Sequence, residues 1–179
     1  MTPGAGAPLI VTLQMDERSQ ERFDRLRELH FPPERNYLKT HLTLFHKLPG
    51  GREAEVRSEL REVCQDREPI TLSATGLRFL GRGVAYGLAS PGLEALRRDL
   101  ARRWEPWLGA QDRQGFKPHV TVQNKVSPEQ ARALHQELQA TFSPFEVEGI
   151  GLSLWRYLGG PWKPAGSYPF RERPEKVAT

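Results

Sequence analysis

Two nine-residue stretches of the chain share one pattern of residues that could do chemistry. "KTHLTLFHK" at 39–47 and "KPHVTVQNK" at 117–125 both read Lys, any residue, His, apolar, Thr, apolar, two residues, Lys. The chain has only five histidines, and two of them, His41 and His119, occupy the same place in this pattern. Because the side chains of a β-strand alternate between its faces, each histidine shares a face with the threonine two residues later.

Two imidazoles that face each other across a groove form an acid/base pair. Histidine titrates near neutral pH, so one ring can take up a proton while the other releases one. The hydroxyls of Thr43 and Thr121 can donate hydrogen bonds to the non-bridging oxygens of a bound phosphate. The pattern therefore predicts attack on a phosphodiester without a metal ion, in which one histidine activates water and the other protonates the departing oxygen.

The residues around these motifs allow further readings. His41 and His46 form an H-x4-H pair, but their odd spacing places them on opposite faces of a regular strand, so we expect neither a shared metal ion nor a catalytic role for His46. Phe45 shares the His41 face, where its ring could stack on a base or pack in the core. Lys47 and Lys125 recur at equivalent positions, either as phosphate contacts at the rim of a groove or as soluble strand ends.

The two motifs lie in similar surroundings. The expected elements of the first half are a strand at 8–14, a helix at 17–30, a strand at 40–46, a helix at 52–65 and a strand at 70–80. Those of the second half are a strand at 83–89, a helix at 91–104, a strand at 119–123, a helix at 128–142 and strands at 145–158 and 167–170. Strand, helix, His-strand, helix and strand thus occur twice in the same order.

Capping residues and apolar spacing support the expected helices. Asp16 and Ser127 precede helices as N-caps, and Ser127 is followed three residues later by a glutamine, as in a capping box. Phe23, Leu26 and Leu29 recur at helical spacing and are expected to form the buried stripe of the first helix.

The repeated order indicates an internal duplication, about 8–81 and 82–170, within a single bilobal domain 1–179 that ends in a tail at 171–179. We expect an α+β fold of two pseudo-symmetric lobes, with antiparallel-rich β-sheets, helices outside and a central active-site groove. His41 and His119 would face one another across that groove.

Composition limits the class of protein. No apolar run approaches the ~20 residues of a membrane span, and the N-terminal stretch has no basic region typical of a signal peptide. Cys64 is the only cysteine, so neither an internal disulfide nor a thiolate metal cluster is expected. These features favour the cytoplasm. The formal net charge of +4 suits a phosphate-bearing partner, although Arg97 and the arginines near it are expected only to solubilise a helix.

The motifs carry a family resemblance. "HLTL" at 41–44 and "HVTV" at 119–122, in a duplicated α/β frame, resemble the 2H phosphoesterase superfamily, and within it the group of 2′-5′ RNA ligases and RNA 2′,3′-cyclic phosphodiesterases. The resemblance implies a bilobal fold that works without a metal or other cofactor. It further implies that His41 donates a proton, that His119 accepts one, and that Thr43 and Thr121 hold the phosphate.

The expected function is hydrolysis of 2′,3′-cyclic phosphodiesters of RNA ends or nucleotides, which the resemblance implies gives 2′-phosphates, with 2′-5′ RNA ligation as the reverse reaction. The expected partners are RNA with a cyclic phosphate end or a small cyclic nucleotide, with no membrane, and the protein would act as a monomer. Two alternatives remain open: a phosphodiesterase acting on 2′-5′ oligonucleotides or nucleotide-sugar cyclic phosphates, and a non-catalytic module that binds RNA ends. Two titrating groups at symmetric positions favour the enzyme.

Overall fold

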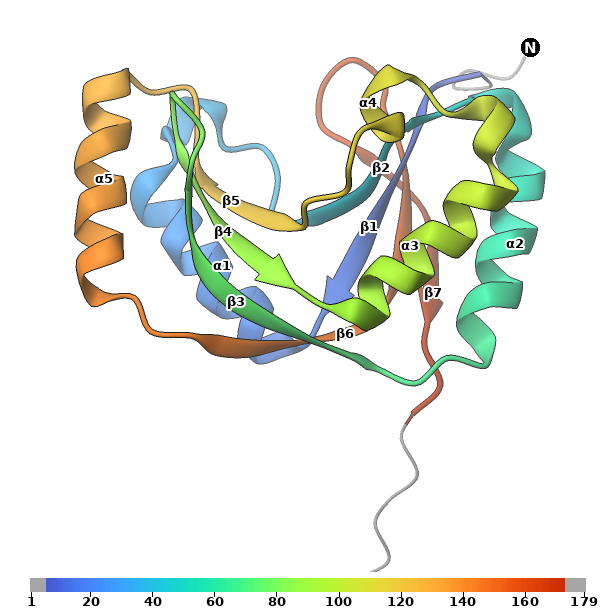
Figure 1. Ribbon diagram of the computed structural model, residues 1–179. Helices are drawn as coiled ribbons and strands as arrows, with labels where there is room; N and C mark the ends of the chain where they lie inside the picture. Colours follow the sequence, from blue (N-terminus) through green and yellow to red (C-terminus); the bar gives the residue numbers. More distant parts are fainter. Residues whose placement is uncertain (1–5, 173–179) are drawn as a thin grey trace, which may run out of the picture.

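One antiparallel sheet of seven strands organises the molecule (Figure 1). The computed structural model describes residues 6–172. The strands are β1 (Leu9–Met15), β2 (Leu42–Leu48), β3 (Ile70–Phe79), β4 (Val84–Ala89), β5 (His119–Gln123), β6 (Phe145–Arg156) and β7 (Lys163–Pro169). Their order in the sheet is β2-β1-β6-β3-β4-β5, and β7 pairs with β6.

The strand order has a two-fold pattern. If each strand is exchanged for its counterpart in the other half (β1 with β4, β2 with β5, β3 with β6), the order reads the same from the opposite end. The third strand of each half therefore pairs with the other half, which joins the two lobes in one sheet. The expected α+β fold of two pseudo-symmetric lobes is confirmed, and its origin by duplication stays a prediction.

Four longer helices cover the lobes, and their caps agree with the sequence. They are α1 (Glu17–His30), α2 (Glu53–Gln65), α3 (Pro91–Arg103) and α5 (Pro128–Thr141), and a short α4 (Ala110–Arg113) follows α3. The side chains of Asp16 and Ser90 accept backbone N–H groups of the first helical turns of α1 and α3, and Ser127 forms the expected capping box with Gln130. These side chains satisfy N–H groups that a helix leaves without partners.

Two helices cross from one lobe to the other. Helix α1 follows β1 but contacts β5, on the side of the molecule that holds α5 (Figure 1). Helix α3 follows β4 but lies with α2 and donates a hydrogen bond from Arg97 to the carbonyl of Leu44 in β2. Each His-bearing strand is thus supported by a helix from the other half of the chain.

The buried face of α1 differs from the expected stripe. Phe23 is fully buried, but Leu29 is 76% exposed, so its assignment to the core was wrong. The buried positions are Ser19, Phe23 and Arg27, spaced four residues apart along the helix. Arg27 takes the place of an apolar residue because α1 lies against β5, where its guanidinium meets a backbone carbonyl of the strand.

Both His-bearing strands lose regular alternation directly after their threonine. Thr43 pairs with Thr12 but Phe45 with Val11, so β2 carries one extra residue between these two pairs. The same shift follows Thr121 in β5. Such a bulge re-aims the side chains beyond it. Phe45 is fully buried as a result, and the suggestion that it stacks on a base was wrong.

The remaining differences concern where elements begin and end: β2 spans Leu42–Leu48 rather than 40–46, so that His41 precedes it. Strand β7 begins at Lys163 rather than at 167, and α4 was not expected. Of the expected tail, 173–179 lies outside the described residues. Within the described part of the chain, no helix has the length and apolar character needed to cross a membrane.

Candidate active site

The two repeated histidines lie where the outermost strands of the path meet. His41 directly precedes β2 and His119 begins β5. Although β2 and β5 lie at opposite ends of the strand order, the sheet curves so that these two strands contact each other (Figure 1). Burial is the main cause that lowers the pKa of His41, and the charge of a protonated His119 acts in the same direction, so the two rings lie within reach of each other's charge. The fold therefore brings together two residues that are far apart in the chain.

Both imidazoles are held by the same local hydrogen bond. Nδ1 of His41 lies 3.0 Å from the carbonyl oxygen of Lys39, and Nδ1 of His119 lies 2.9 Å from that of Lys117. A carbonyl oxygen can only accept, so each Nδ1 carries the hydrogen and donates it. This assigns the same tautomer to both rings and leaves each Nε2 for proton transfer.

The environment favours the neutral form of both rings in the free protein. Burial lowers the pKa of His41 to about 4, against an upward effect of the Lys39 carbonyl, and the charge of Arg27 lowers it further. Burial also lowers the pKa of His119, and the nearby charge of Arg78 acts in the same direction. A bound phosphate would reverse the electrostatic effect, because a negative charge favours the protonated ring.

The two threonines lie close to this pair with their hydroxyls available. Thr43 and Thr121 are each two residues past a histidine, before the bulge, so regular alternation places them on the histidine face. Both side chains are half-buried. Among the residues from 6 to 172, neither hydroxyl makes a hydrogen bond, so both can donate to a ligand.

Each histidine of the pair lines a groove of different character. The first, of about 470 Å³, is here called the cationic groove; its lining includes Thr43, His46, Arg78, Arg97, Lys117 and His119. The second, of about 520 Å³, is called the aromatic groove; its lining includes Tyr37, His41, Ile150, Trp155 and Trp162. The site therefore has a charged side next to His119 and an apolar side next to His41.

The aromatic groove is built from segments distant in sequence. The ring centroids of His41 and Trp162 are 4.5 Å apart, and Trp162 lies 6.1 Å from Trp155. Trp155 is fixed by a hydrogen bond from its Nε1 to Thr12. Sequence reasoning missed both tryptophans, because Trp162 belongs to no repeated motif and approaches His41 only through the segment between β6 and β7.

Three arginines that sequence reasoning missed surround the pair. Arg78, from β3, lies 3.3 Å from Nδ1 of His119. Arg27 and Arg97, on the two crossing helices, donate to carbonyls of Thr121 and Leu44 respectively. Burial lowers the pKa of both, but arginine stays protonated in proteins. Arg97 is therefore part of the site wall and not a solubilising residue, as the sequence had suggested.

His46 also lies in the cationic groove, contrary to expectation. It comes after the bulge in β2, and so the odd spacing from His41 no longer places it on the opposite face. Its Nδ1 donates to the carboxylate of Asp112 at 3.1 Å. The presence of a second histidine in the first motif could have suggested a role for His46. Its position in the groove could not be predicted, because strand periodicity does not show the bulge.

Lys47 and Lys125, the lysines that end the two motifs, line neither groove. Lys125 has a left-handed backbone (φ 62°) in the turn after β5, and Lys47 donates its backbone N–H to Asp112. The structure gives no support for Lys47 or Lys125 as phosphate contacts.

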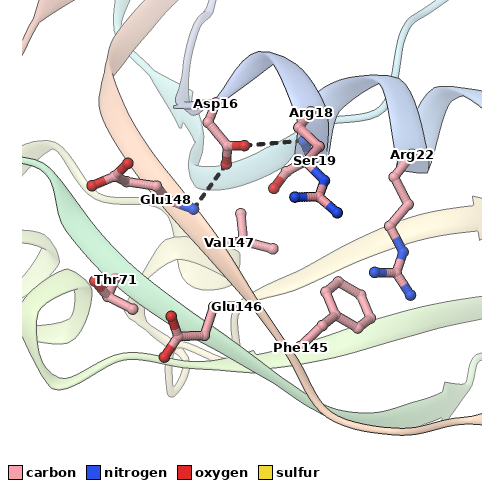
Figure 2. Close-up of a pocket in the computed structure, with 9 residues that line it drawn as sticks. All are labelled: Asp16, Arg18, Ser19, Arg22, Thr71, Phe145, Glu146, Val147 and Glu148. Carbon is pink, nitrogen blue, oxygen red and sulfur yellow. Dashed lines mark hydrogen bonds between the residues drawn. The ribbon is translucent and has the colours of Figure 1, made fainter.

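A third surface pocket, of about 490 Å³, lies apart from the histidines at the N-terminus of α1. Figure 2 shows Glu146 and Glu148 on the β6 side of this pocket and Arg18 and Arg22 on its α1 side. The carboxylate of Asp16 accepts the backbone N–H groups of Ser19 and Glu148, which ties α1 to β6. Because charges of both signs line it, this pocket has no preference for an anion.

Metal ligands are not gathered at the site. Among residues 6–172, no three side chains of His, Cys, Asp or Glu are grouped so that they could hold a metal ion. Cys64 is buried, and burial raises the pKa of its thiol to about 12, so it is a protonated core residue.

Comparison with known proteins agrees with this architecture. The sequence model of the 2′-5′ RNA ligase superfamily matches residues 15–161. No curated protein sequence matches the chain significantly. TT0787 of Thermus thermophilus is similar in structure, with a TM-score of 0.65 at 16% identity, covering 92% of this chain and 98% of that one. Escherichia coli LigT complexed with 3′-AMP has a TM-score of 0.62 at 20% identity, with the same coverage. At these identities, the structural likeness concerns the fold.

Proposed function

The chain belongs to the 2′-5′ RNA ligase superfamily, and on that premise we propose that it hydrolyses 2′,3′-cyclic phosphodiesters of RNA ends or nucleotides. One observation carries the proposal: His41 and His119 converge from two strands with both Nδ1 atoms tied to carbonyls, so that both Nε2 atoms are left for proton transfer. A module that only bound RNA ends would need no such matched pair.

The proposed reaction uses the two rings in opposite senses. Nε2 of His119 takes a proton from water, the water oxygen forms a bond to phosphorus, and the bond from phosphorus to the 3′ oxygen breaks. His41 becomes protonated on Nε2 when the negatively charged substrate binds, and it gives that proton to the 3′ oxygen, which leaves a 2′-phosphate and a 3′-hydroxyl. The hydroxyls of Thr43 and Thr121 donate to the non-bridging oxygens as charge develops. Neither proton transfer requires a metal ion.

The aromatic groove suits a nucleoside. A base that stacks on Trp155 or Trp162 gains about 1–3 kcal/mol, with little dependence on sequence, and stacking there places the ribose next to His41. If a 5′-hydroxyl of a second RNA took the place of water, the same groups would form a 2′-5′ bond. Both histidines come from one chain, so a monomer suffices for either reaction.

The four 2′,3′-cyclic nucleotides test the proposal directly. Purified protein incubated with each of them in the presence of EDTA is expected to release nucleoside 2′-phosphates, resolved from the 3′ isomers by chromatography. His119→Ala should remove this activity, and His135→Ala, which changes a histidine of α5, should retain it. Full activity in a folded His119→Ala protein, or activity that EDTA abolishes and zinc restores, would contradict the proposal.

A further inference from the structure

A histidine and a buried carboxylate form a second polar centre in the cationic groove. Oδ1 of Asp112 accepts both the backbone N–H of His46, at 2.8 Å, and its Nδ1–H, at 3.1 Å. Oδ2 accepts the backbone N–H of Lys47 at 3.0 Å. Asp112 is 2% exposed, and Arg97 binds its carbonyl oxygen at 2.7 Å. The α4 segment is thereby fixed to β2.

This arrangement orients the His46 ring. Burial alone would raise the pKa of Asp112, but the hydrogen bonds from His46 and Lys47 outweigh it and lower that pKa. An ionised carboxylate only accepts hydrogen bonds, so Nδ1 of His46 carries the hydrogen. Nε2 is then free, and the side chain, 40% exposed, lines the groove. In the neutral ring Nε2 only accepts, but when the imidazole is protonated both nitrogens donate, and Nε2–H can then bind an anion while Nδ1–H stays on Asp112.

The charge of the groove favours a second anion. Arg78 and Lys117 line it together with the histidines, and Asp112 is the only acidic residue among the described residues of the lining. Both oxygens of the Asp112 carboxylate already accept hydrogen bonds, so its negative charge is compensated and repels a bound anion less. One phosphate at His119 and Thr43 would leave the part of the groove near His46 unfilled. Clefts lined by one sign of charge concentrate ions of the other.

We propose that His46, oriented by Asp112, binds a second phosphate group of the substrate. The inference deepens the proposed function and rests on it: the favoured substrate carries its cyclic phosphate at the histidine pair, its base in the aromatic groove and another phosphate in the cationic groove. That phosphate is either a 5′-phosphomonoester or the internucleotide phosphodiester of an RNA end. Within residues 6–172, no equivalent of α4 supports the aromatic side, so the subsite belongs to the cationic groove alone.

Binding measurements without turnover test the subsite separately from the reaction. Isothermal titration calorimetry would compare three ligands: adenosine 2′-monophosphate, adenosine 2′,5′-bisphosphate and a dinucleotide that ends in a 2′-phosphate. The wild-type protein should bind a doubly phosphorylated ligand about tenfold more tightly, the scale of one charge-assisted hydrogen bond. If only the bisphosphate binds more tightly than adenosine 2′-monophosphate, the subsite takes a phosphomonoester. If the dinucleotide binds more tightly, the subsite takes an internucleotide phosphate.

Variants decide whether His46 is responsible. In His46→Ala and in Asp112→Asn the ratio of affinities should fall towards one, whereas His135→Ala should keep it. His46→Gln serves as a second variant if alanine lowers the melting temperature strongly. Three results would each overturn the subsite. The first is an affinity ratio that stays unchanged in the His46 variants, the second is an equal loss of affinity for all three ligands in those variants, and the third is a wild-type protein that binds all three ligands equally well. The absence of cyclic phosphodiesterase activity would instead count against the proposed function, because these measurements involve no hydrolysis.

Discussion

The imidazole of His41 lies against the indole of Trp162, with 4.5 Å between ring centroids. The two residues are far apart in the chain: one precedes β2 and the other precedes β7. Burial is the largest cause of the low pKa of His41, about 4, and the indole is part of what covers the ring. The same side chain forms a wall of the aromatic groove, which couples base binding to the proton affinity of His41.

Trp162→Ala should raise the pKa of His41 from about 4 towards the usual value for histidine, because water regains access to the ring. NMR titration of the imidazole signals measures this shift. The variant should also bind nucleotides more weakly, by the loss of about 1–3 kcal/mol of stacking. Tyr157→Ala changes an exposed aromatic residue of the same segment that lines neither groove, and it is the matched control. An unchanged pKa in Trp162→Ala would show that other groups desolvate His41.

His41→Ala and His119→Ala should each slow turnover by ~10²–10⁴-fold, the usual scale for general acid–base catalysis. A cyclic substrate with sulfur in place of the 3′ bridging oxygen separates the two roles, because a thiolate leaves without being protonated. It should restore much of the rate to His41→Ala and little to His119→Ala. Rescue of His119→Ala alone would reverse the assignment of donor and acceptor.

Binding of a phosphate ligand near pH 6 should be accompanied by proton uptake. In the free protein the pKa of His41 is about 4, so this ring starts neutral, and the pKa of His119 is also lowered. The negative ligand raises both pKa values, and protons bind. Calorimetry of adenosine 2′-monophosphate binding in buffers of different ionisation enthalpy counts these protons. In the double variant His41→Ala, His119→Ala the uptake should disappear. Equal binding enthalpies in all buffers for the wild-type protein would argue against the neutral pair.

Arg78→Gln should raise the pKa of His119, because the charge that lies 3.3 Å from its Nδ1 and lowers that pKa is removed. Loss of a cation from the groove should also raise KM for phosphate-bearing substrates more than it lowers kcat, since the interaction is present in both ground and transition states. NMR titration and steady-state kinetics measure the two effects. Arg98→Gln, on the exposed face of α3, should change neither. A pKa of His119 that stays the same would place the Arg78 charge too far away to act.

Glu53→Gln should destabilise the fold by roughly 1 kcal/mol, at the upper end for partly exposed ion pairs. Glu53 joins the start of α2 to the end of β6 through two hydrogen bonds from Arg156, of 2.6 and 2.7 Å, which lower its pKa to about 2. A carboxyl group whose pKa is lower in the folded than in the unfolded protein stabilises the fold at pH values above the pKa of the unfolded state. This stabilisation is lost as the pH falls towards about 2, the pKa of Glu53 in the folded state. The difference in the free energy of unfolding should therefore shrink in acid.

The exposed pair of Arg52 and Glu55 provides the comparison for this prediction. Its nitrogen–oxygen distance is 2.9 Å, but both side chains are about half exposed, at 51% and 50%. Glu55→Gln should accordingly change the free energy of unfolding by a few tenths of a kcal/mol at most. Equal effects of the two substitutions in denaturant titrations would show that the bidentate geometry of Glu53 adds nothing.

Much of the fold could be predicted because its signals are local. Asp16 and Ser127 cap helices through atoms only three residues away. Alternation of apolar and polar side chains predicts the strand that follows each helix. The packing of α1 could not be predicted in this way. Leu29 is exposed and Arg27 is buried because α1 crosses to β5 of the other half, and helical spacing alone does not show which face meets a partner.

The sequence by itself determined which strands bear the repeated histidines and that each threonine lies on the histidine face, because alternation over two residues is a local property of the backbone. Only the tertiary structure decided which other side chains join them. The extra residue in β2 arises from its pairing with β1; it turns Phe45 into the core and leaves His46 in the groove, where Asp112 from a separate segment binds it. Trp162 and Arg78 reach the histidines by the same kind of long-range approach. Which side chains surround an imidazole depends on contacts between strands and loops that are distant in the chain. The pattern of neighbouring residues in the sequence does not predict such contacts.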